Sequence, residues 1–327
     1  MMLKSSYQII NHKGTYEVIF GKEWAGIPLS FYNLSKAAVK RIEVAIQKKI
    51  NRSIHLVEFL EPLLYKEDIR CRELDAFIEK FKPLAVEGKL DEAMLYDDWP
   101  RYGAPKFLFE VDNPYQEANK IRSILKKTRL SYNALKFYLS YYGGITKSKF
   151  VIEENKSSIK ELQKKQYAIE VKKMPTSWLL NNYFPLKVLR EVAKKLKVEI
   201  KARKKSVFVE KLLTKAPEKQ VFKIAAKIHP VVGYHFKTIE NLSVEKANWF
   251  YDYLTLGALL IFGTLEDKIE ATTLLHEYGK VIIRSTERSC SRCKQMSGKI
   301  VTMIEHLPPY HLGCGCIVSI AVNNEKV

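Results

Sequence analysis

The chain has 327 residues, of which 46% are hydrophobic and 28% charged, and its formal net charge is +19. That length accommodates two or three domains, each with its own core, and the composition excludes an intrinsically disordered chain. The sequence shows no secretory signal, and its apolar uncharged stretch Tyr253–Leu265 is too short to cross a bilayer, so we expect a soluble, cytoplasmic protein with no membrane partner and a buried helix in that stretch.

The first 150 residues mix strand and helix signals. Thr15–Phe20 is aromatic and β-branched, which predicts a strand, and Ser35 is placed to cap a helix over residues 36–50. Lys106–Asp112 predicts a second strand, and Tyr115–Tyr142 predicts one or two helices that end before a pair of glycines. Residues 1–150 therefore form an α+β domain for which the sequence assigns no role.

Few polar residues in this first part suggest chemistry. His12, His55 and Cys71 are isolated from other ligand-forming residues, and we interpret all three as structural. Residues 151–175 are rich in charge and poor in glycine and proline, which predicts a charged linker or a helix between two domains.

The positive charge is concentrated in one segment. Residues 1–100 contain fifteen basic and fifteen acidic residues, whereas residues 156–223 contain nineteen basic residues against six glutamates. A local positive field of this kind favours a polyanionic partner, most often nucleic acid. A lysine-rich solvated surface is the alternative, and composition does not separate the two.

The centre of the basic segment predicts two short amphipathic helices joined by an extended connection. An apolar stripe at helical spacing consists of Leu186, Leu189, Val192, Ala193 and Leu196. The opposite face of this first helix carries Lys187, Arg190, Lys194 and Lys195. The connection, which we call the extension cluster, carries Lys201, Arg203, Lys204 and Lys205. Ser206 can cap the second helix, and the two helices must pack together to bury their apolar sides.

This arrangement, over residues 176–217, resembles the SAP or helix-extension-helix DNA-binding modules. The pieces that carry the resemblance are "LREVAKKLKVEI" and "KKSVFVEKLL", and "KARKK" stands where the family usually has a glycine. The resemblance implies DNA binding through contacts between lysines and phosphates, without base recognition. We therefore predict that the two basic sets named above bind DNA non-specifically.

Four of the five cysteines lie between Arg288 and Ile317, together with a histidine. Cys290 and Cys293 form a C-x2-C pair, and after seventeen intervening residues His311, Cys314 and Cys316 form an H-x2-C-x-C group. Two such pairs brought together by the chain can complete a tetrahedral zinc site. Five candidates compete for four positions: we expect the first four to bind zinc and keep Cys316 as the reserve.

Other interpretations of the cysteines fit the sequence less well. A disulfide is disfavoured without a secretion signal, and a redox C-x2-C requires a thioredoxin-like βαβ setting that the flanking sequence lacks. An iron–sulfur cluster has enough cysteines, but the histidine among them favours zinc. Ordinary buried cysteines would have to cluster here by chance.

The order "VIIRSTERSCSRCKQMSGKIV" followed by "LPPYHLGCGC" resembles the C-terminal domain of phage head-morphogenesis proteins, the Mu F-like minor capsid family. The resemblance covers about forty residues strongly and extends back to about eighty-five, into residues 240–327. The family usually has a longer stretch between its two ligand groups and often an arginine at the position of Gly315. The first 170 residues show no such likeness.

The resemblance implies a minor head protein that associates with phage portal, scaffold or capsid proteins during assembly, and with packaged DNA. Such a protein would act in the host cytoplasm and become part of the virion. The sequence has no glycine-rich phosphate loop, paired-carboxylate motif or Ser/His/Asp signature, so we expect no enzyme. A zinc-containing DNA-binding protein with a non-virion role, in recombination, restriction or toxin association, remains the alternative.

The predicted organisation is multidomain, α+β and mostly α-helical. An N-terminal α+β domain and a charged linker or helix precede the small helical hairpin module, and a C-terminal domain with a zinc knuckle follows.

Overall fold

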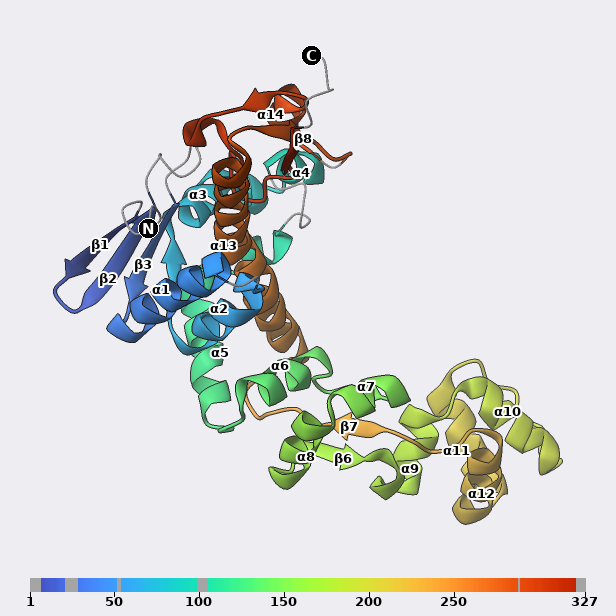
Figure 1. The fold of residues 1–327 in the computed structure, drawn as a ribbon. Coiled ribbons are helices and arrows are strands. Elements are labelled where there is room, and N and C mark those ends of the chain that lie inside the picture. Colours follow the sequence, from blue (N-terminus) through green and yellow to red (C-terminus); the bar gives the residue numbers. More distant parts are fainter. Residues whose placement is uncertain (1–6, 21–28, 52–53, 99–104, 288, 322–327) are drawn as a thin grey trace. The chain divides into compact units, whose positions relative to one another are not determined.

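The computed structural model describes residues 7–20, 29–51, 54–98, 105–287 and 289–321 (Figure 1). It confirms an α+β protein, with 59% helix and 13% strand. The chain divides into two compact units: unit 1 comprises residues 1–125 and 249–327, and unit 2 comprises residues 126–248. Unit 2 is thus inserted in the sequence of unit 1. Within the described ranges, no helix is long and apolar enough to cross a membrane.

Unit 1 contains two antiparallel sheets. The first has the order β1-β2-β3-β4 and consists of Tyr7–His12, Thr15–Phe20, Leu29–Leu34 and Arg70–Cys71. The second has the order β10-β8-β9 and consists of Ile317–Ile320, Val281–Arg284 and Ile300–Val301. The helices that belong wholly or mainly to unit 1 are α1 Lys36–Asn51, α2 Leu56–Lys66, α3 Arg72–Val86, α4 Glu92–Asp98, α5 Pro114–Lys126, α13 Val244–Tyr278 and α14 Ser291–Met296.

The long helix α13 provides much of the core of unit 1. Its stretch Tyr253–Leu265 is largely buried, which confirms the buried helix expected there. Phe262 packs against Phe31 of β3, with ring centroids 5.9 Å apart. The carboxylate of Glu266 forms an ion pair with Lys49 at 2.7 Å and accepts a hydrogen bond from the backbone N–H of Leu56 at 3.1 Å. These contacts join residues more than two hundred positions apart in sequence, and they hold α13 against α1 and α2.

Several elements predicted from the sequence are confirmed. Strand β2 has the predicted bounds, and α1 begins after Ser35, whose hydroxyl accepts a hydrogen bond from the Ala38 N–H at 3.1 Å. The predicted helical region before the two glycines consists of two helices, α5 and α6 (Tyr132–Ser140), and Ser131 caps the second.

The strand predicted at Lys106–Asp112 is wrong. Lys106–Phe109 forms a 3-10 helix, and its aromatic side chains pack in the core: Phe109 lies 5.9 Å from Phe77 between ring centroids. The backbone carbonyl of Phe107 accepts a hydrogen bond from the indole N–H of Trp249. The apolar pattern therefore reflects burial of a single turn, which a short sequence window does not distinguish from a strand.

Unit 2 is built from short helices and a small antiparallel sheet. The sheet has the order β5-β7-β6 and consists of Ile145–Thr146, Tyr234–Phe236 and Ala168–Glu170. Besides α6, its helices are α7 Lys149–Glu154, α8 Lys156–Lys164, the 3-10 turn Val171–Lys173, α9 Thr176–Trp178, the π-helical turn Leu179–Tyr183, α10 Leu186–Lys195, α11 Lys205–Lys215 and α12 Glu218–Ile228.

Candidate metal centre and nucleic-acid interface

The first two cysteines of the cluster lie at the start of α14. Cys290 occupies the N-cap position, and its sulfur accepts a hydrogen bond from the Cys293 N–H at 3.4 Å. This bond satisfies one of the backbone donors that a helix N-terminus leaves free. It also turns both sulfurs toward the same point, as a C-x2-C knuckle requires.

The second group returns on the segment before β10. The backbone reverses in a turn in which the Cys314 N–H donates to the His311 carbonyl at 3.2 Å, and Gly313 has a φ of 69°. Gly315 packs closely on Ser289, since a Cβ atom at this position would lie 3.2 Å from the Ser289 hydroxyl oxygen. A small residue therefore suits this position, where the resembling family often has an arginine.

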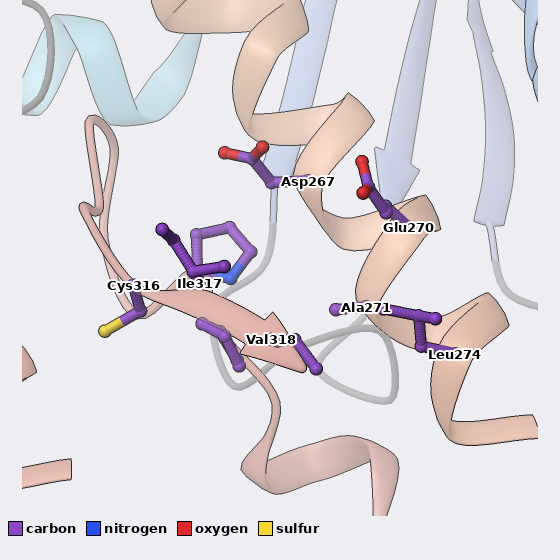
Figure 2. Close-up of a pocket in the computed structure, with 9 residues that line it drawn as sticks. Asp267, Glu270, Ala271, Leu274, Cys316, Ile317 and Val318 are labelled. Atoms are coloured by element: carbon purple, nitrogen blue, oxygen red, sulfur yellow. The ribbon is translucent and has the colours of Figure 1, made fainter. Parts of the chain in front are cut away.

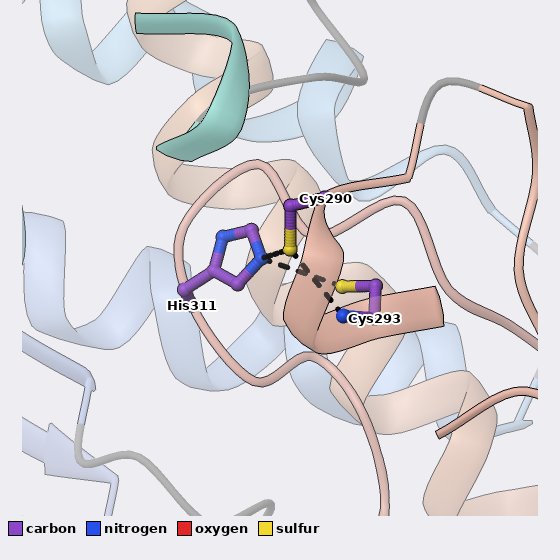
Figure 3. A group of neighbouring side chains, drawn as sticks. All are labelled: Cys290, Cys293 and His311. Carbon is purple, nitrogen blue, oxygen red and sulfur yellow. Dashed lines mark hydrogen bonds between the residues drawn. The ribbon is translucent and has the colours of Figure 1, made fainter. Parts of the chain in front are cut away.

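The two groups meet around Cys293. The Nε2 atom of His311 lies 3.1 Å from the Cys290 sulfur and 3.4 Å from the Cys293 sulfur (Figure 3). The sulfurs of Cys293 and Cys314 are also 3.4 Å apart. Tetrahedral zinc with sulfur ligands at about 2.3 Å separates two sulfurs by roughly 3.8 Å, so small shifts suffice to accommodate the ion.

The histidine is oriented by a backbone contact. Its Nδ1 atom lies 2.7 Å from the Leu312 carbonyl oxygen. Because a carbonyl only accepts, Nδ1 carries the hydrogen and Nε2 keeps a lone pair directed toward the thiols. His311 is therefore in the tautomer that a metal ligand needs.

The donor set is buried and forms two overlapping triads. Cys290, Cys293 and His311 form one, and Cys293, Cys314 and Cys316 form the other; the candidate ligand atoms within each triad lie within 4.8 Å of one another. The four cysteines are all at least 93% buried and belong to an apolar cluster of unit 1. The Cys293 thiol donates a hydrogen bond to the Cys314 sulfur, and this bond lowers the pKa of Cys314. The same bond is the main reason that the pKa of Cys293 is raised. A buried cluster of this composition could hold a metal ion such as zinc.

A neighbouring acidic pair is separate from the cluster. Asp267 and Glu270 of α13 line a pocket of about 100 Å³ beside β10 (Figure 2). The sulfur of Cys316, which also contributes to the pocket wall, points away from this pair. Among the described residues, the groups with suitable ligand spacing contain cysteine and histidine only.

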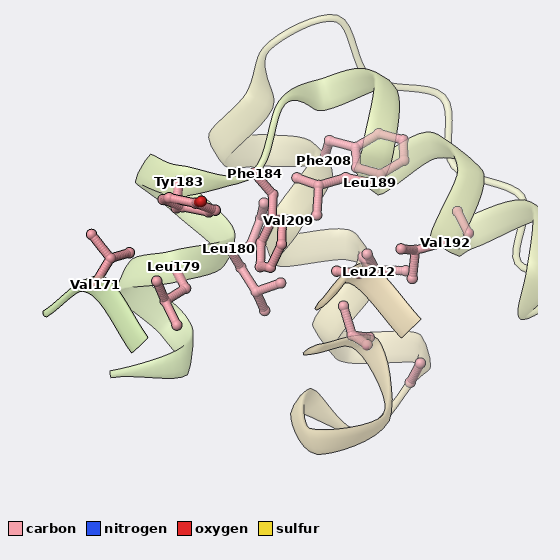
Figure 4. Close-up of a cluster of buried hydrophobic side chains, with 14 residues drawn as sticks. Val171, Leu179, Leu180, Tyr183, Phe184, Leu189, Val192, Phe208, Val209 and Leu212 are labelled. Atoms are coloured by element: carbon pink, nitrogen blue, oxygen red, sulfur yellow. The ribbon is translucent and has the colours of Figure 1, made fainter. Parts of the chain in front are cut away.

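The basic module in unit 2 has the two predicted helices, α10 and α11. Its core includes residues of the preceding π-helical turn, of α10 and of α11 (Figure 4). The third helix α12 also contributes Val221 and Ala225, and α10 packs on both α11 and α12. The sequence interpretation did not anticipate this third helix. Ser206 does not cap α11, because the helix begins at Lys205 and Lys204 is the N-cap residue, with no side-chain hydrogen bond.

Most of the predicted DNA-binding side chains are exposed. On α10 the exposed basic residues are Lys187, Arg190, Lys194 and Lys195. One of these, Lys195, forms an ion pair with Glu191 at 3.3 Å. In the extension cluster Lys205 differs from the other three: it is half-buried, and burial lowers its pKa, with a further contribution from Lys147.

Lys147 was missed because it lies outside the module in sequence. Its amino group lies 3.9 Å from the centroid of the Tyr183 ring, and burial lowers its pKa. A sequence pattern gives no signal for such a contact between distant residues. Lys147 extends the positive surface at the start of α11.

No protein-family model, curated protein or solved structure matches this chain.

Proposed function

We propose that this chain is a minor head protein of a phage or prophage, with a structural zinc site and a basic module that binds DNA without sequence preference. It acts in capsid assembly or DNA packaging and has no catalytic role. The observation that carries this proposal is the convergence of the C-x2-C and H-x2-C-x-C groups, which are the residues of the resemblance to head-morphogenesis proteins. Its partners are portal, scaffold or capsid proteins in the host cytoplasm, and it is incorporated in the virion.

A structural role for the metal follows from the donor set. Four protein ligands close a tetrahedral zinc site, whereas catalytic zinc keeps a position for water or substrate. Five buried or half-buried donors converge here, which is more than a closed site needs. Cys290, Cys293, His311 and Cys314 are the proposed ligands, with Cys316 in reserve. The ion would link α14 to the segment before β10, two short pieces with little secondary structure between them.

Non-specific DNA binding is supported by the exposed charge of the basic module. Lysine ammonium groups contact phosphates as point charges, whereas base recognition in the major groove usually uses the bidentate guanidinium of arginine. The two basic sets contain only two arginines, Arg190 and Arg203, both exposed. Affinity should therefore arise from counterion release and vary little with DNA sequence.

Mass spectrometry of purified phage particles tests the virion role, and the genome neighbourhood gives an independent test. Neighbouring portal, terminase or capsid genes and a few copies of the chain per particle are the expected result. Absence from particles, with neighbouring recombination or restriction genes, would instead support the alternative of a zinc-containing DNA-binding protein outside the virion.

A further inference from the structure

One face of the sheet β1-β2-β3-β4 carries a group of polar side chains. Strand pairing places His12 opposite Thr15 and Tyr32 opposite Arg70. These residues share a face with Glu17, because side chains alternate along a strand. On the other face of the sheet, Val18, Phe20, Leu29 and Phe31 are buried in the core, whereas β1 is mostly exposed.

Glu17 is a buried carboxylate with both oxygens engaged. Its Oε1 accepts hydrogen bonds from the Ser30 hydroxyl at 2.5 Å and from Arg72 Nε at 2.7 Å. Its Oε2 accepts from Arg72 Nη2 at 3.0 Å and lies 3.0 Å from His12 Nε2. The hydrogen bond from Arg72 is the main reason that the pKa of Glu17 falls to about 2. The carboxylate is thus ionised and already satisfied, and it serves to position the cations around it.

Two guanidinium groups are held next to this carboxylate. Arg72 uses Nε and Nη2 for Glu17, which leaves Nη1, and its guanidinium carbon lies 5.2 Å from the centroid of the Tyr32 ring. Arg70 pairs with Asp68 at 3.2 Å, and its guanidinium carbon lies 4.6 Å from the centroid of the Tyr115 ring. The Arg70 Nε atom is buried, and within the described part of the chain it has no hydrogen-bond partner. Both side chains are therefore oriented and retain donors.

Arg70 and Arg72 line a cavity of about 450 Å³, together with His12, Thr15, Glu17 and Tyr32. Asn33, which also lines it, has a φ of 60°, in the left-handed region that residues other than glycine seldom adopt. Its side-chain N–H donates to the Asp68 carbonyl at 2.9 Å, which holds this backbone conformation.

We propose that this cavity binds the phosphoryl group of a small phosphate ester. Among the described residues that line it, Glu17 is the only acidic one and is saturated, so the remaining hydrogen-bonding capacity consists chiefly of guanidinium N–H donors from Arg72 and Arg70. These donors come from different elements, and a tetrahedral phosphate accepts hydrogen bonds from several directions, whereas a carboxylate is planar. The cavity is larger than a phosphate ion, and its volume lies in the range of sites for small organic ligands. This function goes beyond the proposed head-protein role and belongs to a different part of unit 1.

Calorimetric titration of the full chain tests the proposal, with inorganic phosphate, a nucleoside monophosphate and a 5′-phosphorylated oligonucleotide as separate probes. A variant with all four residues of the extension cluster changed to alanine serves as the matched control for phosphate binding elsewhere. We expect saturable one-site binding of the mononucleotide in both the native chain and the control, and binding at least about tenfold weaker in Arg72→Gln. Tighter binding of the mononucleotide than of inorganic phosphate would assign the attached organic group to the same cavity.

Three outcomes would overturn the proposal: no saturable binding in the native chain, loss of binding only in the extension-cluster variant, or unchanged affinity in a folded Arg72→Gln variant. If Arg72→Gln does not fold, the same titration is carried out on two other variants, His12→Gln and Thr15→Val, which change exposed residues of the cavity. These two changes must weaken binding while the melting temperature stays near the native value. When the mononucleotide is added, nitrogen-detected NMR spectra should show a change in the His12 imidazole signals, which would place the ligand in this cavity. Unchanged signals would place it elsewhere.

Discussion

Replacing Cys293 by serine is the sharpest test of the metal centre, because Cys293 is common to both triads of donors. The change removes a thiolate from either possible set of four ligands. Structural zinc contributes about 10–16 kcal/mol of apparent binding free energy in small zinc domains at neutral pH. A whole domain is stable by only about 5–15 kcal/mol. Loss of the ion should therefore unfold residues 281–321 locally, since β9 and α14 are too short to persist alone.

Metal analysis and hydrogen exchange measure this outcome on protein purified without added metal. We expect about one zinc ion per native chain and less than about a tenth of that in Cys293→Ser, with exchange protection lost in 281–321 and kept in unit 2. Cys71→Ser is the matched control, because Cys71 is a buried cysteine outside the cluster. Native exchange protection in a zinc-free Cys293→Ser protein, or an unchanged melting temperature after chelation, would refute the structural role.

Four further predictions concern particular side chains. Cys316→Ser should retain zinc whereas His311→Ala should release it; the reverse result in metal analysis would assign the four cysteines as ligands. Alanine at all four positions of the extension cluster should flatten the salt dependence of DNA binding, the slope falling by about 0.9 for each phosphate that is no longer neutralised, and an unchanged slope in gel retardation would exclude this surface. Glu17→Gln should abolish a stability increment that is fully present above about pH 4.5 and is lost as the pH falls toward about 2, since the folded pKa is depressed; equal acid unfolding curves of the two proteins would contradict this. Leu189→Ala, in the core of the basic module, should cost about 2–5 kcal/mol, and denaturant unfolding followed by hydrogen exchange should place that loss in unit 2 and not in unit 1.

The cysteine cluster was predictable from the sequence because its chemistry is local. A C-x2-C pair and an H-x2-C-x-C group each lie on one turn of chain, so spacing alone indicates which side chains can converge. Spacing did not settle the choice among five donors, which depends on how the two turns approach each other. The structure places Cys293 in both triads, and Cys314 and Cys316 together in one of them.

The polar face of the N-terminal sheet was not predictable in the same way. His12 looked isolated because its neighbours in space, Glu17 and Arg72, are joined only by strand pairing and by the start of α3. The same limit applies to the 3-10 turn at Lys106–Phe109, whose apolar residues are explained by packing against α3 and Trp249. The polar face and the 3-10 turn both depend on contacts between different segments of the chain. The periodicity of a short stretch of sequence carries no information about such contacts.

The interactions of Glu266 have a consequence for the order in which the protein forms during synthesis. The N-terminal half of unit 1 needs α13 to complete its core, because Glu266 binds Lys49 and the start of α2, and Phe262 packs against Phe31. The ribosome makes all of unit 2 before it reaches those residues. The inserted unit can thus finish folding first, while the apolar residues of 1–125 that pack against α13 are still exposed to solvent. A chain truncated after unit 2 would therefore leave these apolar residues exposed. We expect such a fragment to bind chaperones or to aggregate.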